Sequence, residues 1–315
     1  MSNTTPVTIA ATASRGIRTV MGLAAILLWS SLFAITTHAN AAVGALAATG
    51  WSYLIAGGLG LLAGALTGRW PDLRMFPRRY LAAGAACFVL YSVGVFLGLH
   101  LSHGAEQGME VALANYLWPA LLLALSIPIL GAKARWTLGL GLLVALFGLV
   151  LVVGRGQLSA SGLWAQLGAD PLPCLLAAGG AAMWASYSLL TRRWLAGSQV
   201  TALPWFFLLA GVVLLSLARG LPVTQQWTAR TVAETAFLGV FPGWLAYSLW
   251  DRAMLGGDVV LLGAASYGTP LLSTLCSSLY LGVPLSTALG LGCMLLIGGA
   301  LICRFSITES VAAGK

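Results

Sequence analysis

Charged residues are scarce in this 315-residue chain. They make up 8% of it, while 59% of the residues are hydrophobic. A soluble protein of this size carries roughly a quarter charged residues, so the composition argues against an ordinary soluble domain. Regular alternation of polar and apolar residues is also lacking, which argues against an outer-membrane barrel. We therefore predict an all-α polytopic membrane protein.

Sequence patterns for catalysis and for metal or cofactor binding are lacking as well. The chain contains no HExxH motif, no phosphate-binding loop and no pair of aspartates inside an apolar run. Its five cysteines have no CxxC spacing, and we interpret them as packing residues. His100, His103 and Glu106 lie close together in a short polar segment, which we interpret as a solvated loop rather than a metal site. We expect no enzymatic activity, no cofactor and no bound metal.

Apolar runs make up most of the remaining sequence. A helix needs about 20 apolar residues to cross the hydrocarbon core of a bilayer. Runs of about this length predict ten transmembrane helices, at 19–38, 42–66, 80–100, 108–130, 136–153, 172–190, 201–218, 231–250, 259–280 and 286–303.

The basic residues are distributed unevenly along these runs. If the N-terminus is cytoplasmic, then of the 16 lysines and arginines only Arg155, Arg219 and Arg230 fall in outer segments. Cytoplasmic loops of membrane proteins are typically rich in Lys and Arg. We therefore predict a bacterial inner (plasma) membrane protein with both termini in the cytoplasm. Because topology explains the net charge of +8, the charge does not indicate nucleic-acid binding.

The two halves of the chain resemble each other. Three residues of the first half recur 151 positions later, pairing Ala114 with Ala265, Tyr116 with Tyr267 and Pro119 with Pro270. Five helices per half is an odd number, so the second half must enter the membrane from the opposite face, which makes the repeat inverted. The predicted units are an N-terminal tail 1–18, a first repeat 19–153, an outer connector 154–171, a second repeat 172–303 and a C-terminal tail 304–315.

The stretch Asn115-Tyr116-Leu117-Trp118-Pro119 lies inside a long apolar run and is hard to explain by packing alone. A proline within a helix frees the carbonyl four residues earlier, so we expect Pro119 and Pro270 to break their helices and to act as hinges near a central pocket. The predicted pocket residues are aromatic or weakly polar, with one carboxylate: Tyr91, Glu110, Asn115, Tyr116, Trp118, Trp184, Tyr187, Ser266 and Tyr267.

Two alternatives remain open for these residues. Tyr and Trp also form interfacial belts, and prolines also kink helices for shape alone. Glu110 fits either an outer vestibule or a helix edge from which its carboxylate reaches water.

Ionisable residues are absent from the centre of every predicted helix, and Asp251 and Arg252 are expected at an inner edge. Proton-coupled exporters of cations usually keep a buried carboxylate. The absence favours a neutral or zwitterionic substrate that moves down its own gradient.

Several motifs resemble those of the EamA branch of the drug/metabolite transporter superfamily: Leu28-Trp29-Ser30, Trp184-Ala185-Ser186-Tyr187, and the two proline-centred helices that end at Leu130-Gly131 and Leu281-Gly282. The resemblance covers residues 19–303 and implies ten helices in two inverted five-helix repeats. More narrowly, Glu110-Val111, the Asn115–Pro119 stretch and Tyr267-x-Thr269-Pro270 are similar to aromatic amino-acid exporters of the YddG type. That resemblance implies that Tyr116, Trp118 and Trp184 line a central cavity.

The main hypothesis is therefore an exporter of aromatic and other neutral amino acids that works by alternating access. Its partners would be a small amino-acid substrate and the lipid bilayer, and the protein would be a monomer or a weak homodimer. The alternative hypothesis is a multidrug or quaternary-cation exporter, because an aromatic box also suits cations. A third is a membrane receptor or a membrane-embedded enzyme without transport activity.

Overall fold

The computed structural model describes residues 6–31, 33–153, 170–221, 225–269, 272 and 287–309, and most of them are helical. The elements of the first half are α1 (Pro6–Ser31), α2 (Phe33–Val43), α3 (Ala45–Leu66), the short 3-10 helix η1 (Leu73–Met75), α4 (Arg78–Leu101), α5 (Gly104–Asn115), α6 (Trp118–Leu130), β1 (Lys133–Ala134) and α7 (Thr137–Val153). Those of the second half are α9 (Leu172–Leu195), α10 (Leu203–Gly220), α11 (Ala229–Leu238), the π-helix η2 (Gly239–Ala246), α12 (Tyr247–Met254), α13 (Val259–Ser266), α15 (Thr287–Ser306) and β2 (Ile307–Glu309).

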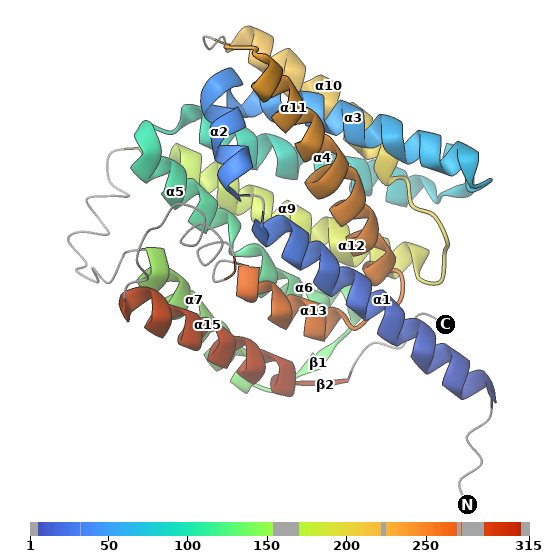
Figure 1. Ribbon diagram of the computed structural model, residues 1–315. Helices are drawn as coiled ribbons and strands as arrows, with labels where there is room; N and C mark the ends of the chain where they lie inside the picture. Colours follow the sequence, from blue (N-terminus) through green and yellow to red (C-terminus); the bar gives the residue numbers. More distant parts are fainter. Residues whose placement is uncertain are drawn as a thin grey trace, which may run out of the picture.

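The helices form one bundle around α9 (Figure 1). The pair α3 and α10 lies on one side of the bundle, and the pair α7 and α15 lies on the opposite side. The strands β1 and β2 pair antiparallel and join the beginning of α7 to the end of α15.

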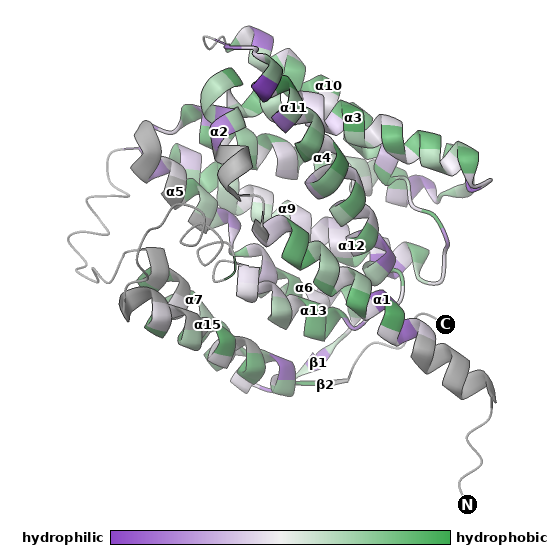
Figure 2. Ribbon diagram, in the orientation of Figure 1, coloured by the Kyte–Doolittle hydropathy of each residue, from purple (hydrophilic) through white to green (hydrophobic). Residues whose placement is uncertain are grey.

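Within the described residues, four helices are long and apolar enough to cross a membrane: α3, α4, α9 and α10. The apolar helices α6, α7 and α15 are shorter. Hydrophobic residues extend along α3, α7 and α15, whereas hydrophilic residues lie mostly near helix ends (Figure 2). Phe147, Met294 and Phe305 turn large apolar side chains outward. These surfaces suit contact with lipid, since exposed apolar patches of this extent are unusual in soluble proteins.

Glycines let two of these helix pairs approach closely. A Cβ atom on Gly50 of α3 would lie 3.3 Å from the carbonyl oxygen of Gly211 on α10, and one on Gly211 would lie 3.0 Å from the carbonyl oxygen of Gly50. The same reciprocal relation joins Gly141 of α7 and Gly299 of α15, at 2.9 Å and 2.6 Å. Small residues at such crossings allow backbone-to-backbone contact between membrane helices.

Two groups of helices face each other across the middle of the bundle. The α9 group contains α4, α5, α6 and α9, which pack on one another, and the α1 group contains α1, η2, α12 and α13. The pairs α3–α10 and α7–α15 flank these groups.

The sequence predicts one helical run over 108–130 that breaks at Pro119, and the structure differs in where the break lies. The chain forms two helices, because α5 ends at Asn115, Tyr116 and Leu117 form a turn, and α6 begins at Trp118. Pro119 thus lies in the first turn of α6, where a missing N–H costs little because first-turn donors have no partner within the helix. In the second half, α13 ends at Ser266, 151 residues after Asn115. Pro270 lies outside the described residues.

Other boundaries also differ from the sequence prediction. α1 begins at Pro6, inside the predicted tail 1–18, and a second helix, α2, follows it from Phe33. The predicted helix 231–250 is part of a continuous helical stretch from Ala229 to Met254 with a π-helical segment around Pro242. An interior proline disrupts the regular hydrogen-bond ladder, and π-helical segments in α-helices are often found at functional sites.

Candidate functional site

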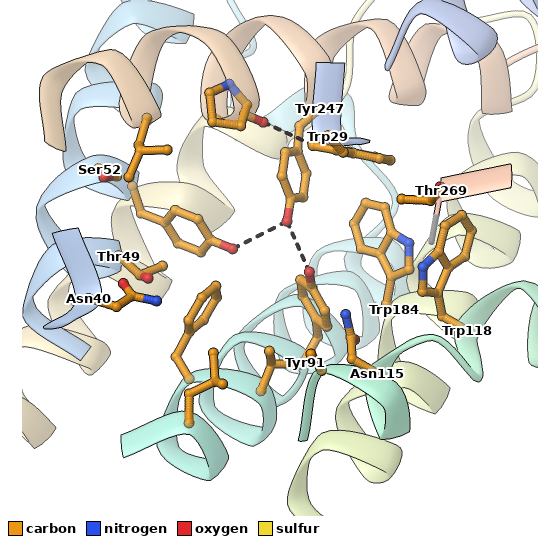
Figure 3. A pocket seen from close by; sticks show the side chains of 18 of the residues that line it. Trp29, Asn40, Thr49, Ser52, Tyr91, Asn115, Trp118, Trp184, Tyr247 and Thr269 are labelled. Carbon is orange, nitrogen blue, oxygen red and sulfur yellow. Dashed lines mark hydrogen bonds between the residues drawn. The ribbon is translucent and has the colours of Figure 1, made fainter. Parts of the chain in front are cut away.

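A cavity of about 260 Å³ lies between the α9 group and the α1 group (Figure 3). Its wall is mostly aromatic and aliphatic, with several neutral polar side chains. The lining residues are Trp29, Asn40, Thr49, Ser52, Tyr53, Tyr91, Val95, Phe96, Leu99, Ala112, Asn115, Tyr116, Trp118, Trp184, Leu238, Pro242, Gly243, Tyr247 and Thr269.

Five of the residues predicted for a central pocket line this cavity: Tyr91, Asn115, Tyr116, Trp118 and Trp184. They reach it from four helices and from the turn between two of them. Tyr91 lies on α4, Trp184 lies on α9, and the break between α5 and α6 presents the other three.

The remaining predicted residues lie elsewhere or cannot be placed. Tyr187 is buried and donates its hydroxyl to the carboxylate of Asp251. Ser266 donates to the carbonyl of Leu262 within its own helix. Tyr267 packs in a separate apolar cluster beside α7 and α15. Glu110 lies on α5, but its side chain is outside the described part of the structure.

The aromatic wall is a network of rings in mutual edge contact. The ring centre of Trp184 lies 5.8 Å from that of Trp29, 5.1 Å from that of Tyr247 and 6.4 Å from that of Trp118, each near perpendicular. Edge-to-face pairs at these distances contribute about 0.5–1.5 kcal/mol beyond area burial. The network therefore holds a rigid, apolar surface against which a planar ring can pack.

Trp29 also fixes the π-helical segment opposite α9. Its indole N–H donates to the carbonyl of Pro242 at 3.1 Å (Figure 3). This bond links α1 to η2 at the cavity wall and keeps Tyr247, one residue after η2, directed into the cavity.

Three tyrosine hydroxyls meet at the centre of the site. The hydroxyl of Tyr247 lies 3.3 Å from that of Tyr53 and 3.2 Å from that of Tyr91 (Figure 3). Each hydroxyl is both a donor and an acceptor. A group of three can therefore share protons internally and still direct a donor toward a bound anion.

Three buried side-chain oxygens on the cavity wall have no hydrogen-bond partner among the residues that the structure describes. They are Oδ1 of Asn40, Oδ1 of Asn115 and Oγ1 of Thr269. A buried polar atom without a partner costs about 1–3 kcal/mol. A ligand with several N–H donors would recover part of this cost by donating to these oxygens.

None of the lining residues in the described part of the chain is an acid, a lysine, an arginine or a histidine. Burial of an unpaired ionic ligand in such a cavity is unfavourable. The wall therefore suits a molecule that is neutral overall and has an apolar body.

Sequence reasoning missed several lining residues, including Trp29, Asn40, Tyr53, Tyr247 and Thr269. For Tyr247 a signal existed, because Pro242 interrupts the run 231–250 in the way that Pro119 interrupts 108–130. Asn40 is an isolated amide among small residues and gives no comparable signal.

An aromatic, weakly polar cavity enclosed between groups of apolar helices is the arrangement expected of a multi-pass membrane transporter for a small molecule. The EamA-like transporter family model matches this chain twice, at residues 17–154 and 171–305. The chain belongs to the EamA-like transporter family, which confirms the family resemblance found in the sequence.

Its relatives include named exporters. The chain is 32% identical to the aromatic amino acid exporter YddG of Salmonella typhimurium (strain 14028s / SGSC 2262) over 286 residues, which cover 90% of this chain and 96% of that protein. It is 33% identical to the aromatic amino acid exporter YddG of Ancylobacter novellus over 296 residues, which cover 92% and 97%. A solved crystal structure, 28% identical, superposes with a TM-score of 0.76 over 92% of this chain and 97% of that one.

Proposed function

We propose that this protein exports aromatic and other bulky neutral amino acids across the bacterial inner membrane. The observation on which the proposal rests is the uncharged aromatic cavity with unpartnered side-chain oxygens on its wall. The names of the relatives, aromatic amino acid exporters, support the same substrate class.

The cavity offers a complement for each part of such a substrate. The ammonium group has three N–H donors, one of which would bond Oδ1 of Asn115 at the break between α5 and α6. The carboxylate would accept hydrogen bonds from the tyrosine hydroxyls around Tyr247. The side chain would pack on Trp184 and its neighbours. A zwitterion keeps its two opposite charges close together, so a neutral, dipolar wall can hold it without a protein charge.

For architecture, we propose ten transmembrane helices in two inverted repeats, with both termini cytoplasmic and with the repeats bounded as the sequence predicts. Three observations support this. The family model matches each half. α3 pairs with α10, and α7 pairs with α15. The helices α5 and α13 end at residues 151 positions apart. Alternating access would then tilt the α9 group against the α1 group around the cavity.

We propose facilitated rather than proton-coupled export, because the described cavity wall has no carboxylate. A role for Glu110 in the outer vestibule stays a prediction. The outward-facing apolar side chains of α7 and α15 suit either lipid or a weakly bound second copy of the chain.

A quaternary-cation exporter is the second candidate, and the close grouping of Trp29, Trp118 and Trp184 favours it. Aromatic faces attract cations with about 0.5–2 kcal/mol each. A quaternary ammonium, however, has no N–H group for the three unpartnered oxygens. The candidates therefore differ in whether hydrogen bonds to the ligand nitrogen contribute to binding.

Calorimetric titration of the purified protein in detergent distinguishes them. Phenylalanine should bind, whereas phenethylamine and phenylpropionate, which lack the carboxylate and the ammonium group respectively, should bind at least about tenfold more weakly, the loss expected for one charged hydrogen bond. Tighter binding of tetraethylammonium than of phenylalanine would reject the amino-acid proposal.

A further inference from the structure

Beyond one end of the cavity, the α9 group and the α1 group pack directly against each other through α9 and α12. This part of the bundle is the half near the beginning of α1, since Arg15 pairs with Asp258 just after α12. Two side-chain hydrogen bonds cross here: Tyr187 donates to both carboxylate oxygens of Asp251 at 3.0 Å and 2.9 Å, and Trp250 donates to Ser188 at 3.0 Å. We name this contact the inner seam.

A third contact extends the inner seam by one more turn of α9. Arg192 donates to the carbonyl oxygens of Gly257, at 2.8 Å, and Met254, at 3.3 Å. The seam is thus a row of polar contacts from one face of α9, with apolar packing around it. Next to the inner seam lies the cavity, where the α9 group and the α1 group are separated by the space that the aromatic wall encloses.

Asp251 is unusual within the inner seam. The sequence predicts it at a solvated inner edge, but the structure buries it to 2% exposure. It makes no ion pair with any residue in the described ranges. The groups that face it are the hydroxyls of Tyr187, Tyr80 and Thr201 and, more distantly, the guanidinium of Arg252. A buried carboxylate with few partners is costly, and in membrane proteins such groups mark functional sites.

We propose that Asp251 and Tyr187 form the latch of the inner gate. The hydrogen bond between them holds the inner seam closed, and separation of α9 from α12 lets water reach the carboxylate. The inference rests on the proposed alternating access, in which this half of the bundle must open. Asp251 acts through Tyr187 and contacts no substrate, so it is a positioning residue.

Ring contacts connect the latch to the cavity, and the most direct one joins Tyr187 to Trp184. Tyr187 stacks on Trp184, with ring centres 5.6 Å apart and planes 27° from parallel. Because Trp184 lines the cavity, a bound ring that shifts Trp184 would also shift Tyr187 and its bond to Asp251. Occupancy of the cavity can thereby influence the inner seam.

The two partners of the latch predict opposite mutational effects. Tyr187→Phe keeps the ring packing but leaves the buried carboxylate without this donor, so the closed seam loses stability. Asp251→Asn removes the charge yet keeps an oxygen that accepts from Tyr187, so the closed seam keeps or gains stability. If Tyr187 and Asp251 only filled space, the two substitutions would not differ in this way in their effect on the closed seam.

Spin-label distances in the full-length protein test this directly, without reference to transport. Labels at Ile17→Cys on α1 and Arg78→Cys on α4, both exposed positions, span the two groups. The five native cysteines are replaced first. We expect Tyr187→Phe to raise the population with separated labels about tenfold, as for the loss of a hydrogen bond to a buried charge, and Asp251→Asn to leave it at or below the unmodified level.

The control is Ser126→Ala, which removes a buried hydroxyl that bonds only within α6 and should leave the distances unchanged. An increase with both latch variants, or no change with Tyr187→Phe, would overturn the proposal. If Tyr187→Phe does not fold, the test rests on Asp251→Asn. An increase in the population with separated labels in Asp251→Asn would contradict the latch. None of these outcomes depends on whether amino acids are the substrate.

Discussion

At the scale of single residues, the site combines an apolar body with neutral polar groups. Trp184 contacts rings from both helix groups and is the centre of the aromatic wall. The unpartnered oxygens of Asn40, Asn115 and Thr269 are distributed along the lining of the same cavity (Figure 3). A wall of this kind distinguishes substrates by ring size and by the presence of an N–H group rather than by net charge.

Trp118→Ala should reduce export of tryptophan and phenylalanine at least tenfold and export of alanine much less. The substitution removes a ring contact of about 0.5–1.5 kcal/mol and apolar burial of about 1.5–3 kcal/mol that only a large substrate uses. Initial rates from proteoliposomes give the comparison, with Trp118→Phe as the control that keeps a ring. Equal losses for all three amino acids would remove Trp118 from the binding site.

Asn115→Leu should weaken phenylalanine binding about tenfold, because the substrate ammonium loses one acceptor. Phenylpropionate, which has no ammonium group, should bind equally to both proteins. Titration calorimetry with the two ligands provides the measurement. If Asn115→Leu lowered the affinity for both ligands by the same factor, Asn115 would act on cavity shape and not on the ammonium group.

Sequence reasoning found the cavity residues near the proline break but assigned Tyr187, Ser266 and Tyr267 to the same site. These three have the right composition and lie inside apolar runs. None of the three is among the cavity-lining residues, because Tyr187 bonds Asp251, Ser266 bonds Leu262 and Tyr267 packs in a separate cluster. Which residues line the cavity depends on the rotation of α9 and α13 about their axes. That rotation is set by packing between helices far apart in the chain and is not visible in local patterns.

At the scale of helices, breaks and close crossings determine the shape of the bundle. The turn at Tyr116 separates α5 from α6 and presents side chains that a continuous helix would point elsewhere. The π-helical segment around Pro242 likewise changes the direction of the side chain of Tyr247, which follows it. Sequence reasoning expected a break at Pro119, whereas the break lies at Tyr116 and Leu117, and Pro119 is in the first turn of the next helix. Hydropathy alone does not locate a break within a continuous apolar run.

Gly299→Ala should destabilise the protein by about 1–3 kcal/mol, the usual cost of overpacking. Its new methyl group would lie 2.5 Å from the backbone nitrogen of Ala145 and would push α15 away from α7. Thermal unfolding in detergent shows this as a lower midpoint. Gly298→Ala is the matched control, since no atom lies within 4 Å of its added Cβ, and an equal shift in both variants would contradict the close crossing.

At the scale of the whole molecule, α3 packs with α10 and α7 packs with α15 on either side of the helices that enclose the cavity. The apolar character of the helices could be predicted from composition, whereas the orientation that the charge bias indicates stays a prediction. The buried position of Asp251 could not be predicted, because it depends on how α12 packs against α9. A residue at the end of an apolar run has the same local sequence whether it faces water or a neighbouring helix.

Orientation in the membrane can be tested with a charged maleimide that does not cross the bilayer. In intact cells of a variant without native cysteines, His103→Cys should be labelled and Arg78→Cys should not, because the charge bias places Arg78 in the cytoplasm. After the membrane is permeabilised, both should be labelled. The reverse pattern in intact cells would invert the proposed topology.

The most direct test of the central claim is efflux of labelled phenylalanine from liposomes that contain the purified protein, measured with and without a proton gradient. The proposed function predicts saturable efflux of similar rate in both conditions, competed by tryptophan and not by tetraethylammonium. Absence of amino-acid flux, together with movement of a quaternary cation only when protons are exchanged, would contradict it.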